Sequence, residues 1–200
     1  MGNAAGSLRH LDTDARQRLA QILLRRGVRQ LGVLRATSAG IARAPTIDDC
    51  AGSIERAREE LLHLERAADL YAEVTGADLL VDAEQTIGEL PHPESWVEAL
   101  LAQLMLCLAA RVELESATEF QVELEPNTRR MLARRAEQVN AARAALHEAR
   151  ATCELRDALH AGTTRWLTVV LGTLEDDGTR QRYTRELERT VEPISVALRH

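Results

Sequence analysis

Two long stretches of this 200-residue chain have the periodicity of helical hairpins, and both carry marked positions at nearly equal intervals. In each stretch, one polar residue is followed after 29 or 30 residues by a second position, and a histidine stands three residues further on. The two sets are Gln30, Glu60 and His63, and Glu115, Ala144 and His147. Positions three residues apart share one face of a helix. The repeated layout therefore predicts two similar helix pairs that pack as one bundle.

Composition favours helices over sheets. The chain is rich in Ala, Leu, Arg and Glu and has only five prolines and one Phe, whereas strands are built mainly from β-branched and aromatic residues. A length of 200 residues suits one domain with a substantial core. We therefore predict an all-α fold, in which residues 1–12 form a flexible arm and residues 13–200 form a single helical domain.

Apolar spacing, caps and helix breakers place the elements along the chain. The predicted elements are a helix from about Ala15 to Arg43, a helix from Thr46–Asp49 to Gly76, a connection over Ala77–His92, a helix opened by Pro93-Glu94-Ser95, a turn at Pro126-Asn127, a helix from about Thr128 to His160, a short helix over Trp166–Leu174 and a final segment over Thr179–Arg199. Gly162 is expected to end the fourth of the long helices. A crossover of this length lets the second helix pair join the first as one bundle.

Charge and hydropathy exclude two classes of partner. The net charge of −6 and the pI of about 5.6 argue against a nucleic-acid footprint, so the basic pair Arg134-Arg135 is interpreted as the solvated face of a helix. The longest apolar run, Ala99–Ala110, is 12 residues long and too short to cross a bilayer. The N-terminus lacks the apolar core of a signal peptide. We expect no nucleic-acid partner and no membrane partner.

The three cysteines favour a reducing environment. They are an odd number and form no C-x-x-C pair. We therefore expect no disulfides, and we expect the protein to be cytoplasmic. Cys107 and Cys153 lie within apolar helical stretches. We interpret both as small buried hydrophobic residues.

The marked positions suggest metal chemistry. Glu60 and His63 share a helix face and can hold one iron or manganese ion, with a carboxylate free to bridge to a second. Di-metal sites in four-helix bundles use one Glu from each of two helices and Glu-x-x-His from the other two. Gln30 and Ala144 stand where two of those carboxylates belong. A second interpretation is that the histidines are buried and hydrogen-bonded to neighbouring carboxylates.

Four short motifs carry a resemblance that covers roughly residues 15–175. They are Arg58-Glu59-Glu60-Leu61-Leu62-His63, Val112-Glu113-Leu114-Glu115, Leu146-His147-Glu148 and Arg165-Trp166-Leu167. With these motifs the chain resembles the ferritin-like superfamily, and within it the phenylacetyl-CoA oxygenase (phenylacetic acid catabolic) subunit branch, with a degenerate di-iron motif. The resemblance implies a ferritin-like four-helix bundle with a long crossover and extra C-terminal helices. Catalytic members of that family activate dioxygen at a di-iron centre, and related subunits have lost ligands.

Three hypotheses follow. In the first, the chain is a divergent ferritin-like metal-dependent oxidoreductase of the oxygenase type, with an incomplete site that acts on a small apolar substrate. Its metal ligands are Glu60, His63, Glu115 and His147, its catalytic residue is Gln30, and its cofactor is iron or manganese, as one ion only or none. In the second, it is a metal-free, non-catalytic structural or regulatory partner subunit. In the third, it is an unrelated helical adaptor. The first two predict a homo-oligomer or a partner subunit.

Overall fold

The computed structural model describes the backbone of residues 8, 11–87, 91–116, 121–149, 154–174 and 176–197, and the side chains of most of them. All regular secondary structure in these residues is helical, so the predicted all-α class is confirmed. The helices are α1 (Thr13–Ile41), α2 (Ile47–Thr75), α3 (Leu79–Ile87), α4 (Trp96–Ser116), α5 (Gln121–Ala149), α6 (Glu154–Gly172) and α7 (Asp177–Ala197).

Side-chain caps set the ends of the first two helices. Asp12 accepts a hydrogen bond from the backbone N–H of Ala15 at the start of α1, and Thr46 accepts one from Asp49 at the start of α2. Gly76 ends α2 with a φ of 73°, in the left-handed region that glycine adopts without strain. The predicted bounds of this hairpin are therefore confirmed to within a few residues.

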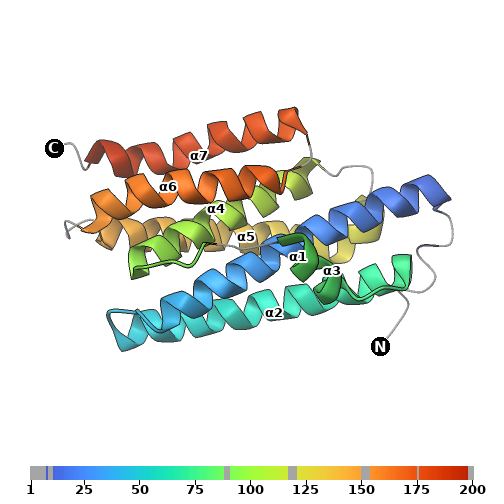
Figure 1. The fold of residues 1–200 in the computed structure, drawn as a ribbon, viewed down its shortest axis with the longest axis horizontal. Coiled ribbons are helices and arrows are strands. Elements are labelled where there is room, and N and C mark those ends of the chain that lie inside the picture. Colours follow the sequence, from blue (N-terminus) through green and yellow to red (C-terminus); the bar gives the residue numbers. More distant parts are fainter. Residues whose placement is uncertain are drawn as a thin grey trace.

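Helix α4 is the centre of the molecule (Figure 1). It packs against α1, α5, α6 and α7, and every side chain from residue 97 to residue 110 is buried. A helix that is apolar on all sides is stable only when other elements surround it. The α1–α2 pair lies on one side of α4, and α6 and α7 lie on the other (Figure 1).

The predicted connection between the second and third long helices was wrong in one respect, because part of it is helical. Helix α3 packs against α1 and α2, and its Leu79 is fully buried. A Cβ atom on Gly27 of α1 would lie 2.8 Å from Leu79 Cδ1. Gly27 thus lets α3 approach α1 closely.

The predicted turn at Pro126-Asn127 was also wrong, because α5 already begins at Gln121 and runs through both residues. A proline inside a helix costs about 3 kcal/mol, and α5, which packs against α4, nevertheless continues through Pro126. Gly162 does not end a helix but lies inside α6. A Cβ atom there would lie 3.1 Å from Leu101 Cδ2, so this glycine also serves close helix packing.

Other sequence predictions have mixed outcomes. The final segment is confirmed as α7, whose first turn is held by Asp176, since Asp176 Oδ1 accepts a hydrogen bond of 2.8 Å from the Thr179 backbone N–H. Leu8 of the predicted arm is buried, and the rest of residues 1–10 lies outside the described residues.

No helix in the part of the chain that the structure describes is long and apolar enough to cross a membrane.

Candidate functional site

Glu60 lies at the centre of a polar cluster inside the bundle. Its side chain comes from α2 and is fully buried. One carboxylate oxygen, Oε1, forms an ion pair with Arg135 Nη1 and accepts a hydrogen bond of 2.9 Å from Gln138 Nε2, both from α5. The first of the predicted metal ligands is therefore bound by a guanidinium and an amide.

Arg135 is as deeply buried as its partner, with 1% of its surface exposed. Besides the carboxylate, its Nη1 donates to Gln138 Oε1 at 3.1 Å and lies 3.4 Å from Cys107 Sγ. Burial is the largest single influence and would lower the pKa of the Arg135 guanidinium, but Glu60 and Cys107 together outweigh it, and the pKa is raised. The Arg135 guanidinium therefore stays charged at neutral pH, where its contact with Glu60 compensates the desolvation of the guanidinium.

Two more arginines are buried in α1. Arg29 donates from Nη1 to the backbone carbonyl of Thr173 at 3.0 Å and forms an ion pair with Glu113 of α4. Burial, together with repulsion from the nearby Arg25 and Arg135, lowers the pKa of Arg29 to about 9. Burial also lowers the pKa of Arg26 to about 10, assisted by Arg135. Both guanidinium groups thus remain charged near pH 7.

His63 and Gln30 complete the interior part of the predicted site. His63 is 8% exposed and Gln30 is 1% exposed. Among the described residues, His63 Nδ1 and both amide atoms of Gln30 have no hydrogen-bond partner. Burial, together with repulsion from Arg135, lowers the pKa of His63 to about 4. The imidazole is therefore neutral at physiological pH.

Glu115 and His147 lie elsewhere. Glu115 is partly exposed and forms ion pairs with Arg182 of α7 and, at 3.8 Å, with Arg111. His147 is exposed. The expectation that His63 and His147 face each other across a shared interior is therefore not met.

The early start of α5 explains why. Glu115 is one residue from the end of α4, and His147 is 26 residues from the start of α5. In an antiparallel hairpin with a rise of 1.5 Å per residue, the two lie roughly 35–40 Å apart along the axis. The similar sequence intervals therefore do not place Glu115 and His147 at the same depth in the second hairpin. Ala144 and Asn140 are exposed on the same helix.

The side chains present do not fit a di-metal centre. Within the described ranges, no group of three or more His, Cys, Asp and Glu side chains is arranged to hold a metal ion. Near Glu60 the neighbouring charges are cationic, since Arg135 binds the carboxylate and Arg26 raises the local potential. A metal ion would have to displace the Arg135 guanidinium. Binding of a metal by any of the four residues stays a prediction.

Sequence reasoning missed Arg135, and it did so for an identifiable reason. The basic pair Arg134-Arg135 was interpreted as a solvated face, which is correct for Arg134, whose side chain is 56% exposed, and wrong for Arg135. The signal lay in the spacing, because Arg135 continues the buried face formed by Gln138, Val139, Ala142 and Leu146. Cys107, by contrast, is confirmed as a buried residue.

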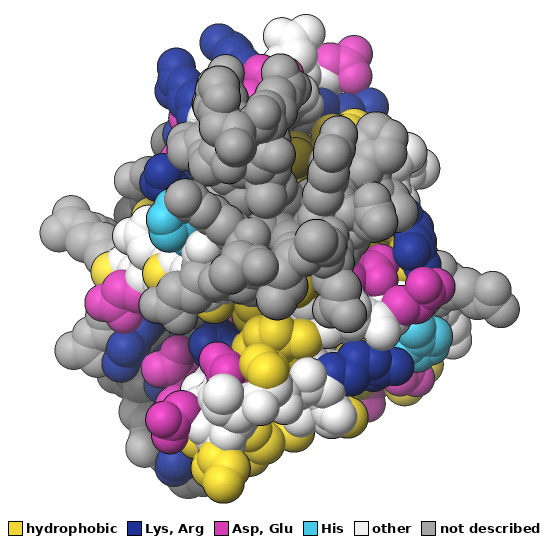
Figure 2. Space-filling view, turned by 90° about the vertical axis from the view of Figure 1, so that its left-hand side faces the viewer, with side chains coloured by type: hydrophobic (Ala, Val, Ile, Leu, Met, Phe, Trp, Pro, Cys, Tyr) yellow, Lys and Arg dark blue, Asp and Glu magenta, His cyan; other side chains and the backbone are white. Residues whose placement is uncertain are grey.

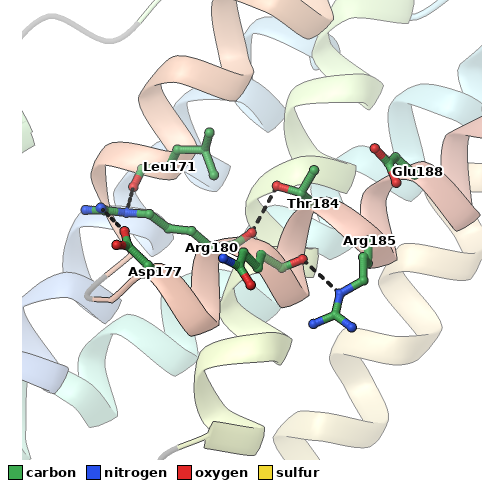
Figure 3. Close-up of a pocket in the computed structure, with 7 residues that line it drawn as sticks. Leu171, Asp177, Arg180, Thr184, Arg185 and Glu188 are labelled. Carbon is green, nitrogen blue, oxygen red and sulfur yellow. Dashed lines mark hydrogen bonds and ion pairs between the residues drawn. The ribbon is translucent and has the colours of Figure 1, made fainter.

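The surface offers a second candidate site, an open groove of about 480 Å³ along α7. Figure 3 shows Arg180 at one end, where it donates to the Leu171 carbonyl at 3.3 Å and pairs with Asp177 at 3.1 Å. Arg185 donates to the Gln181 carbonyl at 3.4 Å. Its described lining residues carry both charge signs, and none of them is a nucleophile paired with a base.

Another surface feature is an apolar stripe on α2. Ile47, Ile54 and Leu61 follow one another at intervals of seven residues, with exposed fractions of 86%, 52% and 49%. Seven residues are close to two helical turns, so the three side chains form a line along one face. Figure 2 shows hydrophobic side chains along the lower edge of the molecule, over α2. We call these three residues the α2 stripe.

Comparison of the chain with protein-family models, with curated proteins and with solved structures finds no match.

Proposed function

We propose that the chain is a metal-free, non-catalytic subunit of ferritin-like architecture, in which a buried ion pair stands where catalytic relatives of that architecture hold a metal. The observation that carries this proposal is the contact between Glu60 and Arg135, both of which are essentially inaccessible to solvent. A guanidinium supplies the positive charge that a carboxylate in a bundle core otherwise receives from a cation.

The arrangement of helices supports the architectural part of this proposal. Two antiparallel pairs, α1–α2 and α4–α5, are joined by a long connection that contains α3, and α1 packs on α4. Ferritin-like bundles have one long crossover between two such pairs. The resemblance also implies extra C-terminal helices, and the presence of α6 and α7 after the second pair supports this part of the proposal.

The α2 stripe supports a role in assembly. Isolated exposed leucines are ordinary, but a line of three large aliphatic side chains at seven-residue spacing is typical of a helix that pairs with another helix. Pairing of two copies about Ile54 in antiparallel orientation would bring Ile47 of one copy against Leu61 of the other. A symmetric contact of this kind buries the same surface on both copies.

Metal content tests the main proposal. The protein is produced in medium supplemented with iron and manganese, and the metal-to-protein ratio is measured for the wild type, for Glu60→Gln and for the control Glu59→Gln. Glu59 is the neighbouring carboxylate and pairs with Arg134 at the surface. We expect only trace metal in all three proteins. Stoichiometric metal that is lost in Glu60→Gln and retained in Glu59→Gln would refute the proposal.

Such a result would favour the second candidate, a divergent metal-dependent oxygenase that holds a single iron or manganese ion. The observation in its favour is that buried His63 Nδ1 and the Gln30 amide have no partner among the described residues. Under this candidate, Glu60 and His63 would hold the ion, and Gln30 would orient a small apolar substrate or dioxygen.

Sedimentation equilibrium tests the assembly role. We expect concentration-dependent self-association of the wild type that Ile54→Glu abolishes, because the substitution places a charge in the middle of the α2 stripe. Leu80→Glu on α3 is the matched control, since Leu80 is 42% exposed and lies outside the stripe. A wild type that stays monomeric at high concentration would contradict pairing of two copies.

A further inference from the structure

A small cavity lies beside the carboxylate of Glu60, between α1, α2, α4 and α5. Its volume is about 10 Å³, which is close to the space that one water molecule requires. The lining residues are Val33, Thr37, Arg56, Glu60, Gln103, Cys107 and Gln138. All of them except Arg56 are at most 7% exposed. The cavity therefore lies largely in the interior of the bundle, and the half-buried Arg56 is its most exposed lining residue.

Four buried polar atoms of these lining residues have no hydrogen-bond partner within the described residues. They are Thr37 Oγ1, Arg56 Nε, Glu60 Oε2 and Gln103 Nε2. Buried polar groups in native proteins nearly always have a partner, either protein or ordered water. Four such atoms around one cavity of this size therefore point to a common ligand.

The chemistry of the four atoms identifies the ligand. Arg56 Nε and Gln103 Nε2 carry N–H donors, Glu60 Oε2 is an acceptor, and the Thr37 hydroxyl can accept. The two N–H groups disfavour a cation, and the Glu60 carboxylate disfavours an anion. A water molecule donates two hydrogen bonds and accepts two, which matches this set of atoms.

We propose that the cavity binds one internal water molecule, which donates to Glu60 Oε2 and Thr37 Oγ1 and accepts from Arg56 Nε and Gln103 Nε2. The water completes the hydrogen bonding of Glu60, whose other oxygen is already bound by Arg135 and Gln138. It also joins α1 and α4 to the pair of helices that carry the ion pair. This inference does not depend on the proposed assembly of the protein.

A high-resolution crystal structure of the wild type is the first test. We expect a single spherical density peak about 2.7–3.2 Å from the four atoms. Absence of such a peak, or direct hydrogen bonds among the four side chains, would overturn the proposal.

Oxygen-17 magnetic relaxation dispersion, which counts long-lived internal waters in solution, is the second test. Gln103→Leu removes one donor and brings apolar atoms into the cavity, and we expect it to hold one internal water fewer than the wild type. Thr168→Val, an exposed threonine on α6, is the control and should leave the number unchanged. A folded Gln103→Leu protein with the wild-type number of internal waters would refute the site. If this variant does not fold, the wild-type crystal structure decides.

Discussion

Removing Arg135 while leaving Glu60 in place should destabilise the protein severely. In Arg135→Met the side chain keeps much of its length, but the carboxylate, which is fully buried, loses its ion-pair partner. Breaking a buried pair in this way costs about 3–5 kcal/mol. For a chain of this size each kcal/mol corresponds to about 2–4 °C in Tm, so we expect Tm to fall by roughly 6–20 °C.

The measurement is urea unfolding followed by circular dichroism, together with two further variants. The double variant Glu60→Leu/Arg135→Met removes both charges, and we expect it to recover most of the loss, because apolar replacement of a buried pair is often neutral or stabilising. Arg134→Met changes the exposed neighbour and should cost less than about 0.5 kcal/mol. A cost for Arg135→Met no larger than that of Arg134→Met would show that the reasoning about the buried pair is wrong.

Three further predictions concern other contacts. Gly27→Val should lower the free energy of unfolding, measured in urea, by about 1–3 kcal/mol, because a Cβ atom added at this position would lie 2.8 Å from Leu79 Cδ1. Adding Leu79→Ala to this variant should restore part of the lost stability. The pKa of His63 is lowered from 6.5 to about 4 in the folded state, so the unfolded state binds the proton more readily, and stability should fall by about 2–3 kcal/mol as the pH drops from 7 toward 4. Glu115→Gln, which removes the partly exposed ion pair with Arg182, should lower the free energy of unfolding by less than about 1 kcal/mol. This difference should become smaller in high salt.

Control variants test whether the effects of Gly27→Val and of His63 protonation are specific to these two positions. The stability of Gly172→Val should change less than that of Gly27→Val, because no atom outside the helix backbone lies within 4 Å of a Cβ at Gly172. The pH dependence should be reduced in His63→Gln and unchanged in His92→Gln, because His92 is exposed. An equal reduction in both histidine variants would contradict the assignment to His63.

The sequence predicted the first hairpin better than the second, and the reason is the kind of signal that each contains. Thr46 and Gly76 are a cap and a left-handed terminator, and both act through the local backbone, so their positions could be read directly. Pro126 has an equally strong local preference, yet α5 runs through it. We infer that packing against α4 sets the bounds of α5. Such packing depends on many residues, so no single residue in the sequence predicts it.

The candidate site also has one part that could be predicted from the sequence and one part that could not. That Glu60 and His63 share a buried face follows from their spacing and from the apolar residues around them. The separation of Glu115 from His147 depends on where α4 ends and α5 begins, so an error of a few residues at that turn moved the predicted site by many ångströms. Arg135 could not be identified as the partner of Glu60, because a guanidinium on a helix is usually solvated unless a particular carboxylate lies opposite it.

The Glu60–Arg135 contact joins α2 to α5, and this has a consequence for how the two hairpins find their alignment. Leucine and alanine side chains pack almost equally well after a slip of one helical turn, which is about 5.4 Å. After such a slip a carboxylate and a guanidinium would each be enclosed by hydrocarbon without a counter-charge. We infer that the contact penalises every misaligned docking of the hairpins, and that a variant with an all-apolar interior would keep its stability but sample more than one register.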